Sequence, residues 1–232
     1  MSQPVAIVTA AGRGMGAACA RELSRRGWSL ALMARSGEVD AVAEECGALA
    51  LRGSVTEQAD VERLVDATLE RYGQLDGVVN NTGHPPRGEL LEFADVEWHD
   101  ALDLVVLNVV RMARAVTPAL VERGGSIVNI STFGAVEPSL DFPLSSALRA
   151  SVGAFAKLYA DRYASAGVRM NNLLPGYIDS YEVDEETLRE IPVGRPGSVR
   201  EVAKTAAFLL TSDSAYITGQ SLRVDGGLTR SV

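Results

Sequence analysis

Short apolar runs alternate along the whole chain with longer segments in which apolar residues recur every three or four positions. A short apolar run bounded by turn residues predicts a buried strand, and the longer spacing predicts an amphipathic helix. We expect seven strands, at 5–9, 29–33, 48–52, 78–81, 126–130, 169–174 and 221–224. We expect six helices between them, near 14–26, 37–46, 57–72, 95–121, 143–165 and 198–211.

The alternation itself predicts the fold. Strands that alternate with helices are joined by right-handed crossovers, which make the sheet parallel and cover both of its faces. We therefore expect an α/β protein: a single doubly wound (Rossmann) domain over 1–232, with a seven-stranded parallel sheet. The long irregular stretch at about 176–197 follows a strand and is expected to form the substrate loop.

Composition narrows the class of partner. The formal net charge is −8 and no stripe of Lys or Arg is present, which argues against nucleic acid or an anionic membrane. No apolar run approaches the roughly 20 residues that span a bilayer, and no signal peptide precedes the first strand. Two cysteines, Cys19 and Cys46, are expected to be reduced, so the cytoplasm is the expected compartment. With only His84 and His99 and no Cys/His cluster, we expect no metal site.

A glycine-rich turn follows the first predicted strand. The segment 9–16 reads Thr-Ala-Ala-Gly-Arg-Gly-Met-Gly, and a helix follows it. Glycines permit a tight turn and let a pyrophosphate approach the backbone, while the helix N-terminus presents free N–H groups to the phosphates. Such turns also occur without a ligand, but this position in a βαβ series favours a dinucleotide.

The end of the second predicted strand bears on which dinucleotide is bound. It reads Ala-Arg-Ser at 34–36 and has no acid for the ribose 2′-hydroxyl of NAD. Arg13 and Arg35 would instead flank a 2′-phosphate, with Ser36 as a further donor. NADP(H) is therefore expected over NAD(H). The alternative is that both are ordinary surface arginines, because only two of the 22 basic residues are lysines.

Further motifs resemble those of the short-chain dehydrogenase/reductase family, in the family's order and over about residues 4–228. Segment 9–16 is similar to the TGxxxGxG turn, 80–83 to NNAG, 125–132 to the strand that ends at the catalytic serine, 175–180 to PGxxxT, and 217–227 to the C-terminal strand region. By this resemblance, Ser54 replaces the family's adenine-binding Asp, and Ile178 and Ser180 contact the nicotinamide. The resemblance implies a cofactor site made of Thr9, Gly12, Arg13, Gly14, Met15, Gly16, Arg35, Ser36, Ser54, Val55, Asn81, Gly83, Arg149, Pro175, Gly176, Ile178 and Ser180.

The family's catalytic positions are altered. Its tetrad is Asn, Ser, Tyr and Lys: the Tyr protonates the carbonyl oxygen as hydride arrives, and the Lys lowers the pKa of that Tyr and holds the ribose. The family's spacing assigns Asn108, Thr132, Ser145 and Arg149 to these positions. Thr132 keeps a hydroxyl and Arg149 keeps a cation. Ser145 is a poor acid, and losing a positioned general acid costs roughly 10²–10⁴ in rate.

Several residues are candidates for a substitute proton donor. His84 follows Asn-Asn-Thr-Gly at the end of a strand, where a histidine with a near-neutral pKa would be a competent donor. Asp141, Tyr177 and Tyr181 are alternatives, and each is equally readable as a loop or pocket-wall residue. If Glu137 or Asp141 faces the pocket, a cationic amine or iminium substrate is favoured.

Two functional hypotheses remain open. The first is an NADP(H)-dependent oxidoreductase with an atypical active site, acting on a small carbonyl/alcohol or imine/amine substrate. The second is a catalytically silent, NADP(H)-binding relative that acts through binding or assembly. A minor alternative is cofactor-free lyase or dehalogenase-like activity, since the Ser/Arg pair resembles halohydrin dehalogenases, but the glycine-rich turn opposes it. The family resemblance also implies a homo-oligomer, a tetramer or dimer, paired through helices 95–121 and 143–165.

Overall fold

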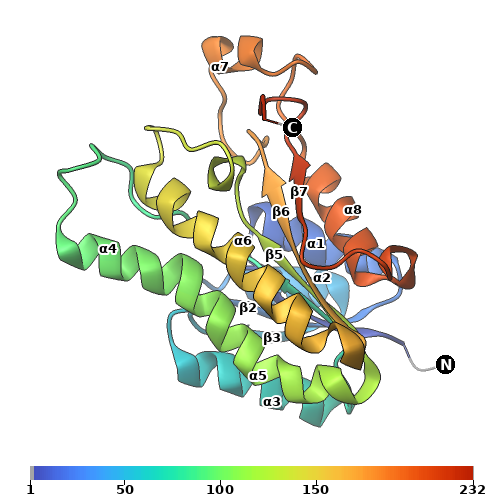
Figure 1. Ribbon diagram of the computed structural model, residues 1–232. Coiled ribbons are helices and arrows are strands. Elements are labelled where there is room, and N and C mark those ends of the chain that lie inside the picture. Colours follow the sequence, from blue (N-terminus) through green and yellow to red (C-terminus); the bar gives the residue numbers. More distant parts are fainter. Residues whose placement is uncertain (1–2, 232) are drawn as a thin grey trace.

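A single parallel sheet organises the protein. The computed structural model describes residues 3–231 and has the strand order β3-β2-β1-β4-β5-β6-β7, with every neighbouring pair parallel (Figure 1). The predicted doubly wound fold is confirmed, because the order reverses direction between β1 and β4. The strands are β1 (Val5–Thr9), β2 (Ser29–Ala34), β3 (Leu49–Arg52), β4 (Gly77–Asn80), β5 (Gly125–Ile130), β6 (Val168–Pro175) and β7 (Ser221–Val224).

Helices cover both faces of the sheet. Apolar residues of α1, α2 and α8 pack on one face, and those of α3, α5 and α6 pack on the other. The α-helices are α1 (Gly14–Arg25), α2 (Glu38–Cys46), α3 (Gln58–Tyr72), α4 (Asp95–Leu102), α5 (Asn108–Arg123), α6 (Pro143–Tyr163), α7 (Glu185–Glu190) and α8 (Val199–Leu210). Shorter helical turns are η1 (Asp103–Leu107), η2 (Phe133–Ala135), η3 (Ala164–Ala166) and η4 (Ser212–Ser214).

Two features differ from the expected elements. The helix expected at 95–121 is divided by η1, a π-helical turn that separates α4 from α5. A π turn keeps a helix continuous in the chain, so apolar periodicity alone does not reveal it. The segment 176–197 also contains α7, which was not expected. This six-residue helix is polar and begins where the Asp184 side chain accepts a hydrogen bond from the Thr187 N–H at 2.8 Å.

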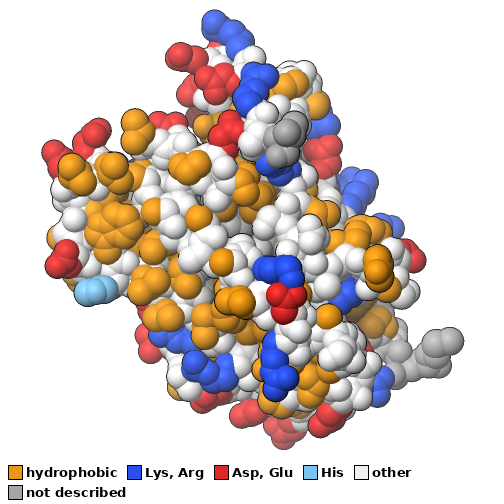
Figure 2. All heavy atoms as spheres, viewed as in Figure 1, with side chains coloured by type: hydrophobic (Ala, Val, Ile, Leu, Met, Phe, Trp, Pro, Cys, Tyr) orange, Lys and Arg blue, Asp and Glu red, His pale blue; other side chains and the backbone are white. Residues whose placement is uncertain are grey.

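The segment Asp95–Arg123 is unusually apolar for its position near the surface. It is 29 residues long with a mean hydropathy of 1.6 in its most apolar window, so by length and composition it could cross a membrane. Only 39% of that window is buried within the chain, and apolar side chains are spread over the face formed by α4, α5 and α6 (Figure 2). A helix of a soluble protein passes the same test, so this segment is weak evidence for a membrane span.

A row of polar side chains crosses the interior of the sheet, which we call the amide row. Asn80, Asn129, Asn172 and Ser221 are register partners on β4 to β7. The Asn80 Nδ2 donates to Asn129 Oδ1 at 3.4 Å, Asn129 Nδ2 to Asn172 Oδ1 at 2.9 Å, and Asn172 Nδ2 to the Ser221 hydroxyl at 3.2 Å. The Thr9 hydroxyl oxygen lies at the end of the row, 3.3 Å from Asn80 Oδ1. Buried amides are tolerated here because each finds a partner on the next strand.

Candidate active site

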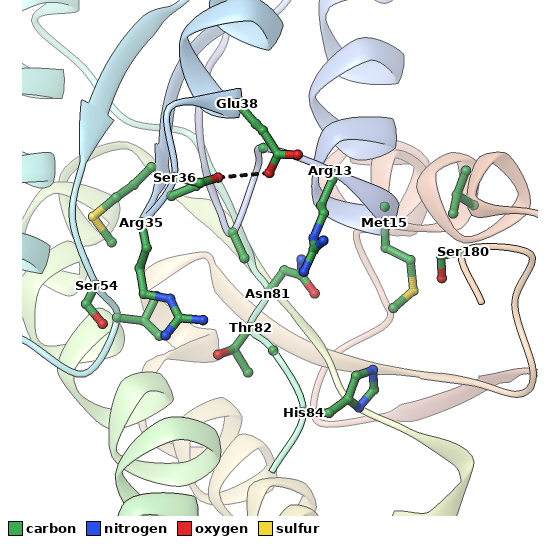
Figure 3. Close-up of a pocket in the computed structure, with 18 of the residues that line it drawn as sticks. Arg13, Met15, Arg35, Ser36, Glu38, Ser54, Asn81, Thr82, His84 and Ser180 are labelled. Atoms are coloured by element: carbon green, nitrogen blue, oxygen red, sulfur yellow. Dashed lines mark hydrogen bonds between the residues drawn. The ribbon is translucent and has the colours of Figure 1, made fainter. Parts of the chain in front are cut away.

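A cleft of about 980 Å³ opens where the strand order reverses, at the carboxyl end of the sheet. It extends from the end of β2, past the glycine-rich turn after β1, to the loops that follow β4 and β6 (Figure 3). Arg35 and Ser36 lie at the first end, and His84, Ser180 and Tyr181 lie at the other. This is the position at which doubly wound proteins bind nucleotides.

The glycine-rich turn is shaped so that added side chains would not fit. A Cβ on Gly16 would lie 2.2 Å from the carbonyl oxygen of Ala10, and Gly14 has a φ of +54°. Helix α1 begins at Gly14, so its first N–H groups have no partners within the helix. The Thr9 hydroxyl donates to the Asn81 carbonyl at 2.7 Å and accepts from the Asn81 N–H at 2.9 Å, which fixes the turn against β4. These features fit a bound pyrophosphate.

Ala10 is the one non-glycine residue among those described that has a positive φ, at 46°. It stands where the family motif has its first glycine. A left-handed conformation costs an L-residue roughly 1–2 kcal/mol. Backbone strain of this kind is often found at functional sites.

The end of the cleft beside β2 contains a carboxylate that was not expected. Glu38 is the first residue of α2 and lines the cleft together with Arg13, Arg35 and Ser36. The Ser36 hydroxyl donates to Glu38 Oε2 at 2.9 Å (Figure 3). The strand end at 34–36 has no acid, as the sequence indicated, but Glu38 brings a carboxylate to the same part of the cleft from the start of the next helix. The sequence signal was the Glu two residues beyond Ser36, which the strand-end motif does not include.

Most of the expected cofactor residues meet along the cleft. Those that line it are Gly12, Arg13, Gly14, Met15, Arg35, Ser36, Ser54, Val55, Asn81, Gly83 and Ser180. Thr9 and Gly16 are buried beneath the turn. The cleft lining also includes Thr82 and Asp179, which the sequence did not single out. Pro175, Gly176 and Ile178 are not among the lining residues, and Ile178 forms a bridge with Gly197.

The side chains assigned to catalysis are not among the residues that line the cleft. Asn108 is buried; its Oδ1 accepts from Asn80 at 3.0 Å and its Nδ2 donates to the Leu104 carbonyl. Ser145, in the first turn of α6, is 6% exposed. Thr132 is half-buried and its hydroxyl accepts from the Gly134 N–H at 3.4 Å. None of these side chains is part of the cleft lining.

Arg149 is a buried cation that has no acidic partner. It is 4% exposed and makes no ion pair within residues 3–231. Its Nη1 donates to the Ile130 carbonyl at 2.9 Å and its Nη2 to the Gly83 carbonyl at 3.2 Å, while its Nε has no partner. Burial lowers the pKa of Arg149 to about 10. The guanidinium therefore connects the end of β5 to the loop after β4, and Arg149 is not among the residues that line the cleft.

His84 and Tyr181 form the far end of the cleft. Their rings meet edge to face, with centroids 5.6 Å apart, and so link the loop after β4 to the loop after β6. Desolvation, and then the positive charges of Arg149 and Arg87, lower the pKa of His84 to about 4. A pKa lowered in this way disfavours the imidazolium form that a near-neutral pKa would allow. At pH 7 His84 is a neutral imidazole and does not act as an imidazolium donor.

Tyr177, in the loop after β6, lies against Phe133 of η2. The two rings are 5.5 Å apart. Burial and then the negative charges of Asp141 and Glu190 raise the pKa of Tyr177, which makes it a weaker acid than an ordinary tyrosine. Asp141, an exposed residue of the loop after β5, is thus close enough for its carboxylate to affect the Tyr177 ring.

Glu137 has a different role from the one considered. Its carboxylate accepts hydrogen bonds from the backbone N–H groups of Arg230 at 2.8 Å and Ser231 at 3.2 Å. It therefore holds the C-terminal segment against the loop after β5. Of the two acids considered for the pocket, Glu137 therefore binds the C-terminal backbone.

The sheet order, the turn and the cleft define a doubly wound protein whose switch point is built for a nucleotide. The sequence family described as Enoyl-(Acyl carrier protein) reductase matches residues 9–229. The chain is 32% identical over 237 residues to the 3-oxoacyl-[acyl-carrier-protein] reductase FabG of Vibrio cholerae, covering 97% of this chain and 96% of that protein. It is also 32% identical to the FabG proteins of Escherichia coli, over 235 residues with 97% and 96% covered, and Staphylococcus aureus, over 238 residues with 96% and 97% covered. The chain belongs to the short-chain dehydrogenase/reductase family of oxidoreductases.

Proposed function

We propose that this protein is an NADP(H)-dependent oxidoreductase with an atypical active site. It would transfer hydride between the nicotinamide and a small carbonyl/alcohol or imine/amine substrate, with Ser145 and Arg149 standing where the family has Tyr and Lys. The observation that carries this proposal is the continuous cleft between the Arg13–Arg35 corner and the His84–Tyr181 pair. A cofactor-free activity would not need such a cleft beside a glycine-rich turn.

The residues present fit this cofactor. The backbone of the glycine-rich turn and the N-terminus of α1 would hold the pyrophosphate. Arg13 and Arg35, both exposed in the cleft, would contact a 2′-phosphate. The nicotinamide end would lie beside Ser180 and the His84–Tyr181 pair. When bound, the cofactor supplies the hydride.

The site lacks a strong proton donor, and this favours an iminium substrate. Ser145 is a poor acid, His84 is neutral at pH 7, and the pKa of Tyr177 is raised. Hydride addition to an iminium carbon gives a neutral amine, so that step consumes no proton. A carbonyl needs one for its oxygen, and the missing general acid would slow it roughly 10²–10⁴-fold.

The charge of the segments that follow β4, β5 and β6 also suits a cationic substrate. The segments 84–100, 131–142 and 176–197 together carry thirteen Asp or Glu residues and three Arg residues. Figure 2 shows acidic side chains over α7 and the neighbouring loops at the top of the molecule, alongside a few arginines. A rim with an excess of one sign of charge raises the local concentration of substrates of opposite charge.

One observation favours a second function, a silent cofactor-binding relative. Thr132, Ser145 and Arg149 are outside the cleft lining, and the Arg149 guanidinium is fixed by two backbone carbonyls. A protein of this kind would keep the cofactor cleft and act through binding or assembly instead of turnover.

Cofactor binding followed by hydride transfer tests both functions. We would titrate the protein with NADPH and NADH by fluorescence, then measure turnover on matched ketones and cyclic iminium ions. Gly16→Val is the control, because its side chain would collide with the Ala10 carbonyl and abolish binding. Turnover of iminium ions above ketones supports the enzyme, binding without any turnover supports the silent relative, and absence of binding contradicts both.

A double variant tests what the catalytic positions have lost. Ser145→Tyr with Arg149→Lys restores the family pair, and we expect ketone reduction to rise by roughly 10²-fold if the substrate pocket is productive. Unchanged ketone reduction in a folded, cofactor-binding variant would favour the silent relative. The unfolding free energy of the variant is measured alongside, since Arg149 is buried.

The remaining expectations concern assembly and compartment. We propose a homo-oligomer, dimer or tetramer, in the cytoplasm, acting on a small molecule and not on nucleic acid or membrane. The partly buried apolar face of α4 to α6, on which Leu158 is exposed, supports the oligomer. Light scattering of the purified protein across a concentration series measures the assembly.

A further inference from the structure

The corner of the cleft next to β2 holds an anion among cations. Glu38 begins α2 and is exposed, and its carboxylate accepts the Ser36 hydroxyl at 2.9 Å. An ideal Cβ on Gly12 would come within 3.2 Å of the Glu38 Cβ and 3.5 Å of the Ser36 hydroxyl oxygen, so both side chains lie directly against the glycine-rich turn. Figure 3 shows Glu38 next to Ser36, on the same side of the cleft as Arg13.

The charges in this corner are free to meet a ligand. Within residues 3–231, Arg13 and Arg35 make no ion pair, and the Glu38 carboxylate pairs with neither of them. All three side chains line the cleft and are exposed. The corner therefore offers two cationic forks and one carboxylate to whatever group an adenosine ribose carries at its 2′ position.

We infer that Glu38 determines cofactor selectivity and makes this site accept NAD(H) as well as NADP(H), an inference that rests on the proposed function. A ribose 2′-hydroxyl can donate to the Glu38 carboxylate, which is a charge-assisted bond. A 2′-phosphate gains Arg13 and Arg35 but is repelled by Glu38, and it must take the Ser36 hydroxyl away from that carboxylate. One residue thus strengthens binding of one cofactor and weakens binding of the other.

Glu38→Gln tests this with direct binding as the readout. The amide keeps the size and the Ser36 contact but removes the charge. We expect the Kd of NADPH to fall about five- to twenty-fold and the Kd of NADH to rise about three- to ten-fold. Glu44→Gln is the matched control, because it removes an exposed charge from the same helix outside the cleft. Arg35→Ala should reverse the preference by weakening NADPH alone.

The outcomes separate this inference from the function on which it rests. Opposite changes in the two Kd values for Glu38→Gln, with none for Glu44→Gln, support it. A Kd ratio that changes less than two-fold, or two Kd values that move together, would overturn it and leave the cofactor site intact. If the unmutated protein bound neither cofactor, both the proposed function and the inference would be wrong.

Discussion

The Arg149 guanidinium is the feature whose energetics are easiest to test, because it is buried without an acid. Burial lowers its pKa from 12.5 to about 10, which at about 1.4 kcal/mol per tenfold change corresponds to a desolvation cost of roughly 3 kcal/mol. Its hydrogen bonds to the Ile130 and Gly83 carbonyls contribute about 1.5–3 kcal/mol each. The two bonds therefore outweigh the desolvation cost by about 0–3 kcal/mol.

This balance predicts that Arg149→Lys destabilises the protein more than Arg149→Met, although lysine is chemically more similar to arginine. Arg149→Met loses both bonds but also the desolvation cost, so we expect a loss of about 0–3 kcal/mol in unfolding free energy. Arg149→Lys keeps a buried charge, reaches one carbonyl and is more strongly hydrated, so we expect a loss of about 2–4 kcal/mol.

Urea unfolding at pH 7.5 measures both variants, with the exposed Arg200→Lys as a control expected within about 0.5 kcal/mol of the parent. The reasoning is refuted if Arg149→Lys matches the parent while Arg149→Met loses more than about 4 kcal/mol. That result would mean that a counter-charge compensates the guanidinium in solution.

Three further predictions concern stability. The pKa of His84 is about 4 in the folded chain and 6.5 ordinarily, so between these pH values the unfolded chain binds more protons than the folded chain. The unfolding free energy therefore decreases as the pH falls from 6.5 to 4. His84→Gln should remove a part of this decrease, as measured by urea unfolding. The pKa of Glu22 is held at about 2, first by its hydrogen bond from Arg25; Glu22→Gln should cost roughly 1–2 kcal/mol at pH 7 after allowance for the exposed partner. That difference should shrink as pH falls from 4.5 to 3, and a pH-independent difference would contradict the ion-pair explanation. Ala10→Gly should raise the melting temperature, because relief of the left-handed alanine outweighs the entropy of glycine by roughly 0.5–1 kcal/mol; a lower melting temperature would show that the turn is not strained.

Much of the fold could be predicted because it depends on local patterns. The strands expected at 5–9 and 221–224 have those bounds in the structure, and the others differ by one residue at one or both ends. Apolar runs mark buried strands whatever surrounds them. The π turn at 103–107 and α7 were missed because neither changes the apolar pattern in a way that sequence alone reveals.

The candidate site was less accessible from sequence, since it depends on how side chains are directed. Motif spacing located the glycine-rich turn, which lines the cleft as expected. It did not reveal that Arg149 turns toward two backbone carbonyls, or that Glu38 reaches the cleft from the next helix. Nor could it give the environment of His84, because a pKa depends on burial and on charges brought close only by folding.

The amide row has a consequence for how the strands align during folding. Asn80, Asn129, Asn172 and Ser221 bond to each other only when their strands are in one particular register. A slip of any strand by one residue would turn its amide to the opposite face and leave polar groups buried without partners, at roughly 1–3 kcal/mol each. The row therefore penalises misaligned sheets that the apolar strand residues alone would tolerate. The same alignment fixes where the loops after β4 and β5 leave the sheet. The position of the cleft wall therefore depends on the register of these strands.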